Sequence, residues 1–435
     1  MTTIDHIRGD HLGLDMPAHR EALRAAGIDF LTRAFRATGA LSADNRVIAI
    51  TRFEECPGGS TGRKLLMSVT YENPSPAPPT ELFVKFSRDF DDAVRDRARD
   101  QLEPEVRLAL LSRAPGFPIA VPICLFADYH HASGTGILIT ERIPFGTGAL
   151  EPLYEKCLDY DMPAPLEHYR ALIKALARLA GTHKAGRLDA GVADEFRFDA
   201  DTAAAAIALR YSAEQLQKRV DRLADFAVRC PGLLPANITS PTFLRQLATE
   251  LPRFVEHEQA IKRFLTSANN LVALIHWNAN IDNGWFWRDD SGELECGLLD
   301  WGGVNQMNVG LALWSALSGA ETTLWDDHLD ELLELFATEF ERCGGPAIAV
   351  DALRLHTLLY AAMMGISWLL DAPRRVETQV AELSGVESRF DPRIKDNEAA
   401  RTVLQMMTNL LNLWQTHGFG TLLDRVLIEN KAENK

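Results

Sequence analysis

Hydrophobic and polar positions follow two different periods along the chain, and the change of period divides the chain into two parts. Residues 19–41 carry apolar side chains three and four positions apart, the spacing that one buried helix face requires. Residues 89–113 show a charged helical pattern in which Pro104 marks a helix start. Short runs rich in β-branched and aromatic residues predict strands. The predicted strands are 46–53, 64–72, 81–87, 119–130 and 135–143.

Beyond residue 144 the pattern becomes overwhelmingly helical. Helices are predicted over 167–186 and 202–228, where apolar residues recur at helical spacing. One strand pair, 284–289 and 293–301, interrupts the helices and is joined by the turn sequence DSG. We therefore expect an α+β protein. Its small sheet lobe would span residues 1–143 and its large helical lobe residues 144–435.

The composition is that of an ordinary globular protein, with 46% hydrophobic and 24% charged residues in a chain of 435. A formal net charge of −15 argues against a nucleic-acid partner, because a phosphate backbone attracts basic surfaces. The six cysteines include no C-x-x-C pair, which argues against a zinc site or a disulfide framework. No secretory signal is visible, and the longest apolar run, 358–370, is too short to span a bilayer. We expect a cytoplasmic protein without membrane insertion.

Two features of the predicted sheet suit the binding of phosphate groups. The turn between the first two strands contains Gly58, Gly59, Ser60 and Gly62, and glycines let backbone N–H groups approach phosphate oxygens closely. The same residues also suit an ordinary hairpin turn. Lys85 lies in a strand among residues that are expected to be buried. A buried ammonium needs an anionic partner, such as a phosphate or a carboxylate.

Two carboxylates and an amide add candidate metal and phosphate chemistry. Glu105 lies near the start of an apolar-faced helix, a position that the helix dipole alone also favours. Asp300 follows two leucines at the end of a predicted strand, where packing does not explain a carboxylate. Together with Asn283 it offers the hard oxygen ligands that Mg²⁺ prefers.

The order and spacing of these residues resemble the aminoglycoside phosphotransferase and choline-kinase-like group of the protein-kinase-like fold, including its ecdysteroid-kinase-like branch. Members carry a loop H-G-D-x-x-x-x-N, followed by a strand pair and a D-[FW] motif. Here His276, Asn278 and Asn283 fall at the H, D and N positions of "HWNANIDN", and Asp300 begins "DW". The resemblance covers about residues 30 to 320. It implies a two-lobed fold with a small antiparallel-sheet N-lobe and a large, mainly helical C-lobe.

The resemblance also implies roles for the candidate residues. Lys85 and Glu105 match the phosphate-orienting lysine and the helix glutamate of the family, and the glycine turn matches its nucleotide-covering loop. Glu141 and Ile143 belong to "LITERIPFG", which is similar to the hinge against which adenine stacks. The implied cofactors are ATP and Mg²⁺, with Asn283 and Asp300 as metal ligands. The implied partner is a small-molecule acceptor with a hydroxyl group.

Asn278 departs from the family pattern, in which an Asp accepts or orients the proton of the attacking hydroxyl. An amide has nearly the same shape but is not a useful base. The chain is thus a phosphotransferase whose acceptor Asn278 orients, a nucleotide-binding pseudokinase with a regulatory role, or an enzyme of different chemistry, such as nucleotidyl transfer. Asp282 is a candidate replacement base, although it adjoins Asn283.

Residues 188–270 form a long helical insert, which we interpret as the acceptor pocket and lid. No residue in this insert identifies the substrate. The acceptor and the oligomeric state therefore stay open at the level of sequence.

Overall fold

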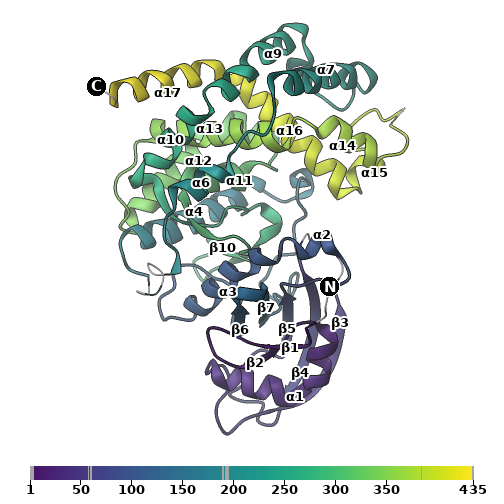
Figure 1. Cartoon of the computed structure of the whole chain (residues 1–435), viewed down its shortest axis with the longest axis vertical. Coiled ribbons are helices and arrows are strands. Elements are labelled where there is room, and N and C mark those ends of the chain that lie inside the picture. The colour runs from purple at the N-terminus through teal and green to yellow at the C-terminus, as the bar shows by residue number, and fades with distance from the viewer. Residues whose placement is uncertain are drawn as a thin grey trace. The chain divides into compact units, whose positions relative to one another are not determined.

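The computed structural model of the chain describes residues 4–56, 58, 61–188, 191, 195–383 and 385–433. The chain forms two compact units, each built from segments that are far apart in the sequence (Figure 1). The first unit comprises Met1–Glu151, Leu188–Phe196 and Gly297–Asn305, and the second comprises Pro152–Arg187, Arg197–Cys296 and Gln306–Lys435. Asp300 therefore lies in the same unit as Lys85 and Glu105.

An antiparallel five-stranded sheet, in the order β3-β4-β5-β7-β6, is the centre of the first unit. A second, two-stranded sheet near the amino terminus was not predicted, because its strands have only three residues each and show no period. The elements of this unit are β1 (His6–Arg8), β2 (Asp15–Pro17), α1 (Arg20–Ala37), β3 (Val47–Glu55), β4 (Arg63–Tyr71), β5 (Glu81–Phe86), α2 (Ala93–Asp96), η1 (Arg99–Gln101), α3 (Leu102–Leu111), β6 (Cys124–His130), η2 (His131–Ser133) and β7 (Thr135–Glu141).

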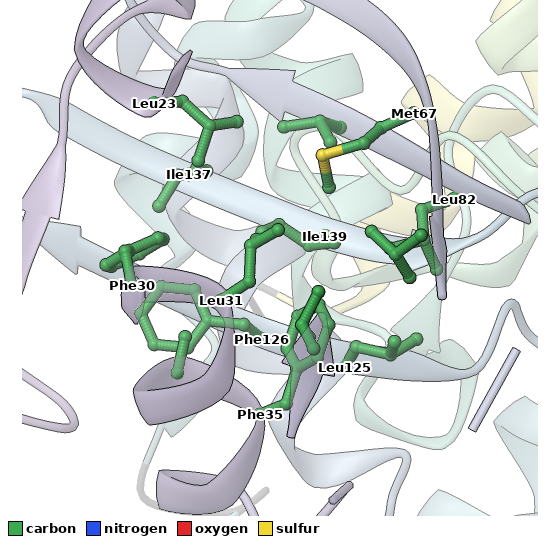
Figure 2. Packing of buried hydrophobic residues seen from close by; sticks show 14 of the residues in the cluster. Leu23, Phe30, Leu31, Phe35, Met67, Leu82, Leu125, Phe126, Ile137 and Ile139 are labelled. Carbon is green, nitrogen blue, oxygen red and sulfur yellow. The ribbon is translucent and has the colours of Figure 1, made fainter. Parts of the chain in front are cut away.

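Helix α1 packs against one face of the five-stranded sheet. Successive side chains of a strand point to opposite faces, so Leu82, Val84 and Phe86 of β5 are buried on the same side. They join Phe30 and Phe35 of α1 in one hydrophobic cluster (Figure 2). Lys85, which alternates with these residues, therefore points to the other face of the sheet.

The face opposite α1 carries helix α3 and the lysines of β4 and β5, Lys64 and Lys85. Leu102 and Val106 of α3 pack against Leu138 of β7 in a second, smaller cluster. The register of β4 and β5 places Lys64 directly opposite Lys85. This face is the one on which the candidate phosphate-binding side chains of the first unit gather.

The second unit is mainly helical, which confirms the predicted α+β class with its small antiparallel sheet and large helical part. Two short strand pairs, β9-β10 and β8-β11, accompany the helices. The remaining elements are η3 (Asp159–Asp161), α4 (Pro165–Lys184), α6 (Ala200–Ala206), α7 (Ala213–Arg229), α8 (Ala236–Thr239), α9 (Pro241–Glu256), α10 (Glu258–Ser267), η4 (Asn269–Leu271), β8 (Val272–Ile275), η5 (Ile281–Asn283), β9 (Gly284–Arg288), β10 (Leu294–Leu298), β11 (Asn305–Asn308), α11 (Val309–Leu317), α12 (Thr322–Arg342), α13 (Val350–Trp368), α14 (Ala372–Gln379), α15 (Pro392–Lys395), α16 (Glu398–His417) and α17 (Phe419–Glu433).

The helical pattern over residues 202–228 is divided into α6 and α7, so the prediction of one continuous helix is wrong. Ser212 accepts a hydrogen bond from the backbone N–H of Gln215 at 3.2 Å, and the Gln215 side chain accepts one from the backbone N–H of Ser212 at 2.9 Å. This reciprocal pair satisfies two backbone donors that a helix start leaves unpaired. A new helix therefore begins here in spite of the continuous apolar pattern.

In the described part of the chain, no single helix has the length and apolar character needed to cross a membrane. Helices α13 and α14 meet these criteria only together, and they are bent by 50° where they join.

Candidate functional site

A three-residue ionic cluster lies on the face of the sheet opposite α1. The Lys85 ammonium of β5 donates to Glu105 Oε1 of α3 at 2.7 Å and to Asp300 Oδ1 at 2.6 Å. The Lys85 and Glu105 side chains are only 12% and 8% exposed, whereas Asp300 is 41% exposed. The structure therefore brings together three residues that are as much as 215 positions apart.

The electrostatics of this cluster favour an ionised lysine. Burial alone would lower the pKa of Lys85, but Glu105 and Asp300 raise it well above its usual range. Burial raises the pKa of Glu105, and the Lys85 ammonium opposes that rise. Two carboxylates share one ammonium, so an ionised cluster carries an excess negative charge, which a cation can balance.

Asp300 has an unusual backbone conformation, with φ at +63°. A residue with a Cβ atom rarely occupies this left-handed region, and such conformations concentrate at functional sites. The next residue, Trp301, holds the segment in place. Its backbone N–H donates to Glu105 Oε1 at 3.3 Å, and its indole N–H donates to the Leu298 carbonyl at 2.9 Å.

The glycine turn between β3 and β4 is described at Gly58 and Gly62, whereas Gly59 and Ser60 lie outside the described residues. Gly58 has φ at +98° and is exposed. Gly62 has φ at +49°, and a Cβ atom added there would lie 1.8 Å from the Phe86 carbonyl oxygen. Only glycine fits this second position, because the turn passes directly against the end of β5.

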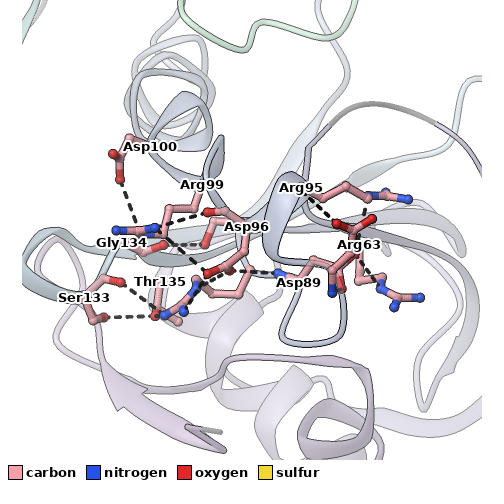
Figure 3. Close-up of polar contacts among 12 residues, drawn as sticks. Arg63, Asp89, Arg95, Asp96, Arg99, Asp100, Ser133, Gly134 and Thr135 are labelled. Atoms are coloured by element: carbon pink, nitrogen blue, oxygen red, sulfur yellow. Dashed lines mark hydrogen bonds and ion pairs between the residues drawn. The ribbon is translucent and has the colours of Figure 1, made fainter. Parts of the chain in front are cut away.

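Arg95 of α2 holds both described glycines of the turn. Its Nη2 donates to the carbonyls of Gly58, at 3.3 Å, and Gly62. Its Nε lies 3.4 Å from Asp89, whose same carboxylate oxygen lies 2.9 Å from Arg63 Nε (Figure 3). The sequence pattern did not predict these contacts of Arg95, because Arg95 lies in a charged segment that looks like an ordinary solvated helix.

The two predicted hinge residues lie at and just beyond the end of β7. Glu141 Oε1 accepts a hydrogen bond from the Ile123 backbone N–H at 2.9 Å. The Ile143 carbonyl accepts one from the Phe145 backbone N–H at 3.0 Å. The Glu141 carboxylate is thus engaged with the backbone of its own unit.

The loop "HWNANIDN" in the second unit is held by its own side chains. Nδ1 of the buried His276 accepts a hydrogen bond from the Asn278 backbone N–H at 3.1 Å. The Asn283 side-chain nitrogen donates to the Asn278 carbonyl at 2.8 Å. Because a carbonyl oxygen only accepts, this bond fixes the orientation of the Asn283 amide. Its Oδ1 has no hydrogen-bond partner among the described residues.

Asn278 and Asp282 have different surroundings within this loop. Asn278 is half-buried, and its Oδ1 accepts a hydrogen bond from the Asn280 side chain at 2.9 Å. Asp282 Oδ2 lies 3.3 Å from the Lys156 ammonium. Burial raises the pKa of Asp282, and Lys156 opposes that rise. The Asp282 carboxylate therefore has a cationic partner within its own unit.

The candidate metal ligands are an amide and a carboxylate in different units, Asn283 and Asp300. Across the described residues, no three His, Cys, Asp or Glu side chains gather into a metal-binding group. Both ligands offer hard oxygen atoms, and Mg²⁺ commonly binds through one or two protein ligands with phosphate and water completing its shell. Each ligand by itself therefore suits a Mg²⁺ ion whose shell is completed by phosphate and water.

Comparison with known proteins finds similar folds at low sequence identity. No protein-family model matches the sequence, and no curated protein matches it. Among solved structures, choline kinase from Cryptosporidium parvum Iowa II is 14% identical, with 91% of this chain and 99% of that chain covered and a TM-score of 0.40. Aminoglycoside-3′-phosphotransferase of type VIII is 18% identical, with 77% and 98% covered and a TM-score of 0.35. Ethanolamine kinase from Plasmodium vivax is 13% identical, with 82% and 81% covered and a TM-score of 0.40.

Proposed function

We propose that the protein is an ATP- and Mg²⁺-dependent phosphotransferase that acts on a hydroxyl group of a small molecule. The observation that carries this proposal is the bridge from Lys85 to Glu105 and Asp300. A lysine held by two carboxylates on the polar face of a sheet, beside a glycine turn, has the parts needed to orient nucleotide phosphates.

In this proposal, Lys85 binds nucleotide phosphates while Glu105 keeps the ammonium in position. The backbone of the turn from Gly58 to Gly62, with Gly59 and Ser60, covers the phosphates. Glu141 and Ile143 contribute the hinge segment for the adenine. Arg95 supports these roles because it holds the turn through the carbonyls of Gly58 and Gly62.

Asn283 and Asp300 would hold the Mg²⁺ ion, which supplies positive charge to the phosphate oxygens as charge develops on them. The Asn283 amide suits this role, because its nitrogen is bonded to the Asn278 carbonyl and its oxygen is the end available to a metal. Asp300 suits it because its carboxylate is the most exposed member of the ionic cluster.

Asn278 would orient the acceptor hydroxyl by hydrogen bonding, and His276 would fix the loop through the Asn278 backbone. Phosphoryl transfer depends mostly on positioning and electrostatics. A missing general base therefore costs roughly 10²–10⁴-fold in rate rather than all activity. Asp282 as a replacement base would first have to leave Lys156.

Calorimetric titration with ATP and Mg²⁺ tests this proposal. Lys85→Ala should weaken ATP binding by about 1.5–3 kcal/mol, the contribution of a hydrogen bond to a charged group. Lys218→Ala is the matched control, because that lysine is 67% exposed on α7 and, among the described residues, pairs with Glu214 alone. Equal ATP affinities in Lys85→Ala and wild type would contradict the assignment. Phosphate transfer is then measured on a panel of hydroxyl compounds.

Asn278 favours a second candidate, a nucleotide-binding pseudokinase with a regulatory role. Asn278→Asp restores a carboxylate of nearly the same shape beside the Asn280 side chain. A rise in ATP turnover of about 10²–10⁴-fold would indicate a weak or decayed kinase that lacks its base. A fall in turnover would indicate an activity that depends on the amide. Unchanged turnover with normal nucleotide binding would show that position 278 is not the catalytic position.

A further inference from the structure

A second lysine faces the same side of the sheet as Lys85. Lys64 in β4 is the direct cross-strand partner of Lys85 in β5, and directly opposed residues of an antiparallel pair have their side chains on the same face. Like charges in this arrangement destabilise a sheet. Lys64 and Lys85 are the only lysines in residues 1–151, where arginine occupies every other Lys or Arg position. The ammonium groups of Lys64 and Lys85 therefore destabilise the sheet unless anionic groups lie close to them.

Among the described residues, carboxylates contact Lys85 and none contacts Lys64. Glu105 and Asp300 lie within 2.7 Å of the Lys85 ammonium. The half-buried Lys64 side chain has no hydrogen bond or ion pair with any described residue. Burial lowers the pKa of Lys64, which Asp300 raises and Lys85 lowers further, so Lys64 lies within electrostatic range of the cluster without contacting it.

The neighbouring Arg63, in contrast to Lys64, has carboxylate partners. Arg63 lies one residue earlier on β4 and is bound to carboxylates on three residues, Glu55, Asp89 and Asp91. Lys64 follows the tightly packed Gly62 by two residues, so its position is set by the same turn. A cation placed just after a glycine turn, beside a second cation and without a partner in the part of the chain that the structure describes, is suited to phosphate oxygens.

We propose that Lys64 is a second phosphate-binding cation of the nucleotide site, whose ammonium contacts a phosphate oxygen of a bound nucleoside di- or triphosphate. This inference rests on the proposed function and adds a residue that none of the sequence motifs assigned. With Lys64 included, the face carries two ammonium groups and two carboxylates.

The test compares Lys64→Met with Lys218→Met, which removes one exposed ammonium from α7. ADP and adenosine are each titrated into both variants and wild type, and ATP is titrated with Mg²⁺. Lys64→Met should weaken ADP and ATP binding roughly tenfold or more, the effect of losing one charge-assisted hydrogen bond. Adenosine affinity should stay unchanged, because adenosine has no phosphate. Lys64→Arg should keep most of the ADP affinity, because the charge is retained.

Thermal unfolding distinguishes binding from folding in these variants. If Lys64 only balanced buried carboxylates, Lys64→Met would lower the unfolding temperature and leave the ratio of ADP to adenosine affinity as in wild type. That unchanged ratio would overturn the inference. A variant that fails to fold is replaced in the test by Lys64→Arg and Lys64→Gln, of which only Gln should lose ADP affinity. Absence of ATP binding in wild type would instead contradict the proposed function itself.

Discussion

Replacing Lys85 by Met removes the ammonium that contacts both carboxylates of the ionic cluster. Glu105 is 8% exposed and would keep its charge in a buried position without a cationic partner in contact. Breaking a buried ion pair in this way typically costs 3–5 kcal/mol. We expect a loss of about 3 kcal/mol in the free energy of unfolding, at the low end of that range, because Asp300 is 41% exposed and stays hydrated.

The loss of stability should depend on pH in a defined direction. Burial raises the pKa of Glu105 above its ordinary value of 4.5, and Lys85 opposes the rise, so removing Lys85 raises that pKa further. A folded-state pKa above the unfolded one means that the folded protein binds the proton more tightly. The loss of unfolding free energy in Lys85→Met, relative to wild type, is therefore small near and below pH 4.5. It grows as pH rises through the folded-state pKa of Glu105.

Urea denaturation at pH 5 and pH 8, followed by circular dichroism, measures this deficit. Wild type, Lys85→Met and the double variant Lys85→Met/Glu105→Gln are compared. Gln removes the buried charge and keeps an acceptor for the Trp301 N–H, so the double variant should recover at least half of the loss. A Lys85→Met protein as stable as wild type at pH 8, an equal deficit at both pH values, or no recovery in the double variant would refute this reasoning.

Two further substitutions test the glycine turn and the loop of the second unit. Gly62→Ala should lower the unfolding temperature markedly more than Gly58→Ala in a thermal melt, because a Cβ at Gly62 meets the Phe86 carbonyl and one at Gly58 meets nothing within 4 Å. Equal effects would show that the turn moves away from β5. Lys156→Met should destabilise the protein in urea denaturation by less than the roughly 3–5 kcal/mol of a fully buried pair, because it leaves Asp282, which is 25% exposed, without its cation. Adding Asp282→Asn should restore most of that loss, and no restoration would contradict the pairing.

Much of the first unit could be predicted from the alternation of its strands. In "ELFVKF", burial of Leu82, Val84 and Phe86 places Lys85 on the other face by the period of two alone. The sequence also singled out Glu105 at a helix start and Asp300 as a candidate metal ligand, and the structure places both in contact with Lys85. Their roles in nucleotide and metal binding stay predictions.

The features that the sequence did not reveal depend on contacts between distant residues. Lys64 looks like an ordinary polar strand residue until the register places it opposite Lys85. Arg95 looks solvated until its contact with Gly62, 33 residues earlier, is known. The division of residues 202–228 depends on the local capping pair at Ser212, which competes with a continuous apolar period.

The effect of Mg²⁺ on ATP affinity tests the proposed nucleotide and metal site most directly. Calorimetric titration of ATP into wild type should show tighter binding with saturating Mg²⁺ than with a chelator. In Asp300→Ala this gain should disappear, because the variant lacks the anionic oxygen ligand proposed for the metal. ATP binding that is equally tight with and without Mg²⁺ in wild type, or a full Mg²⁺ effect retained in Asp300→Ala, would contradict the account.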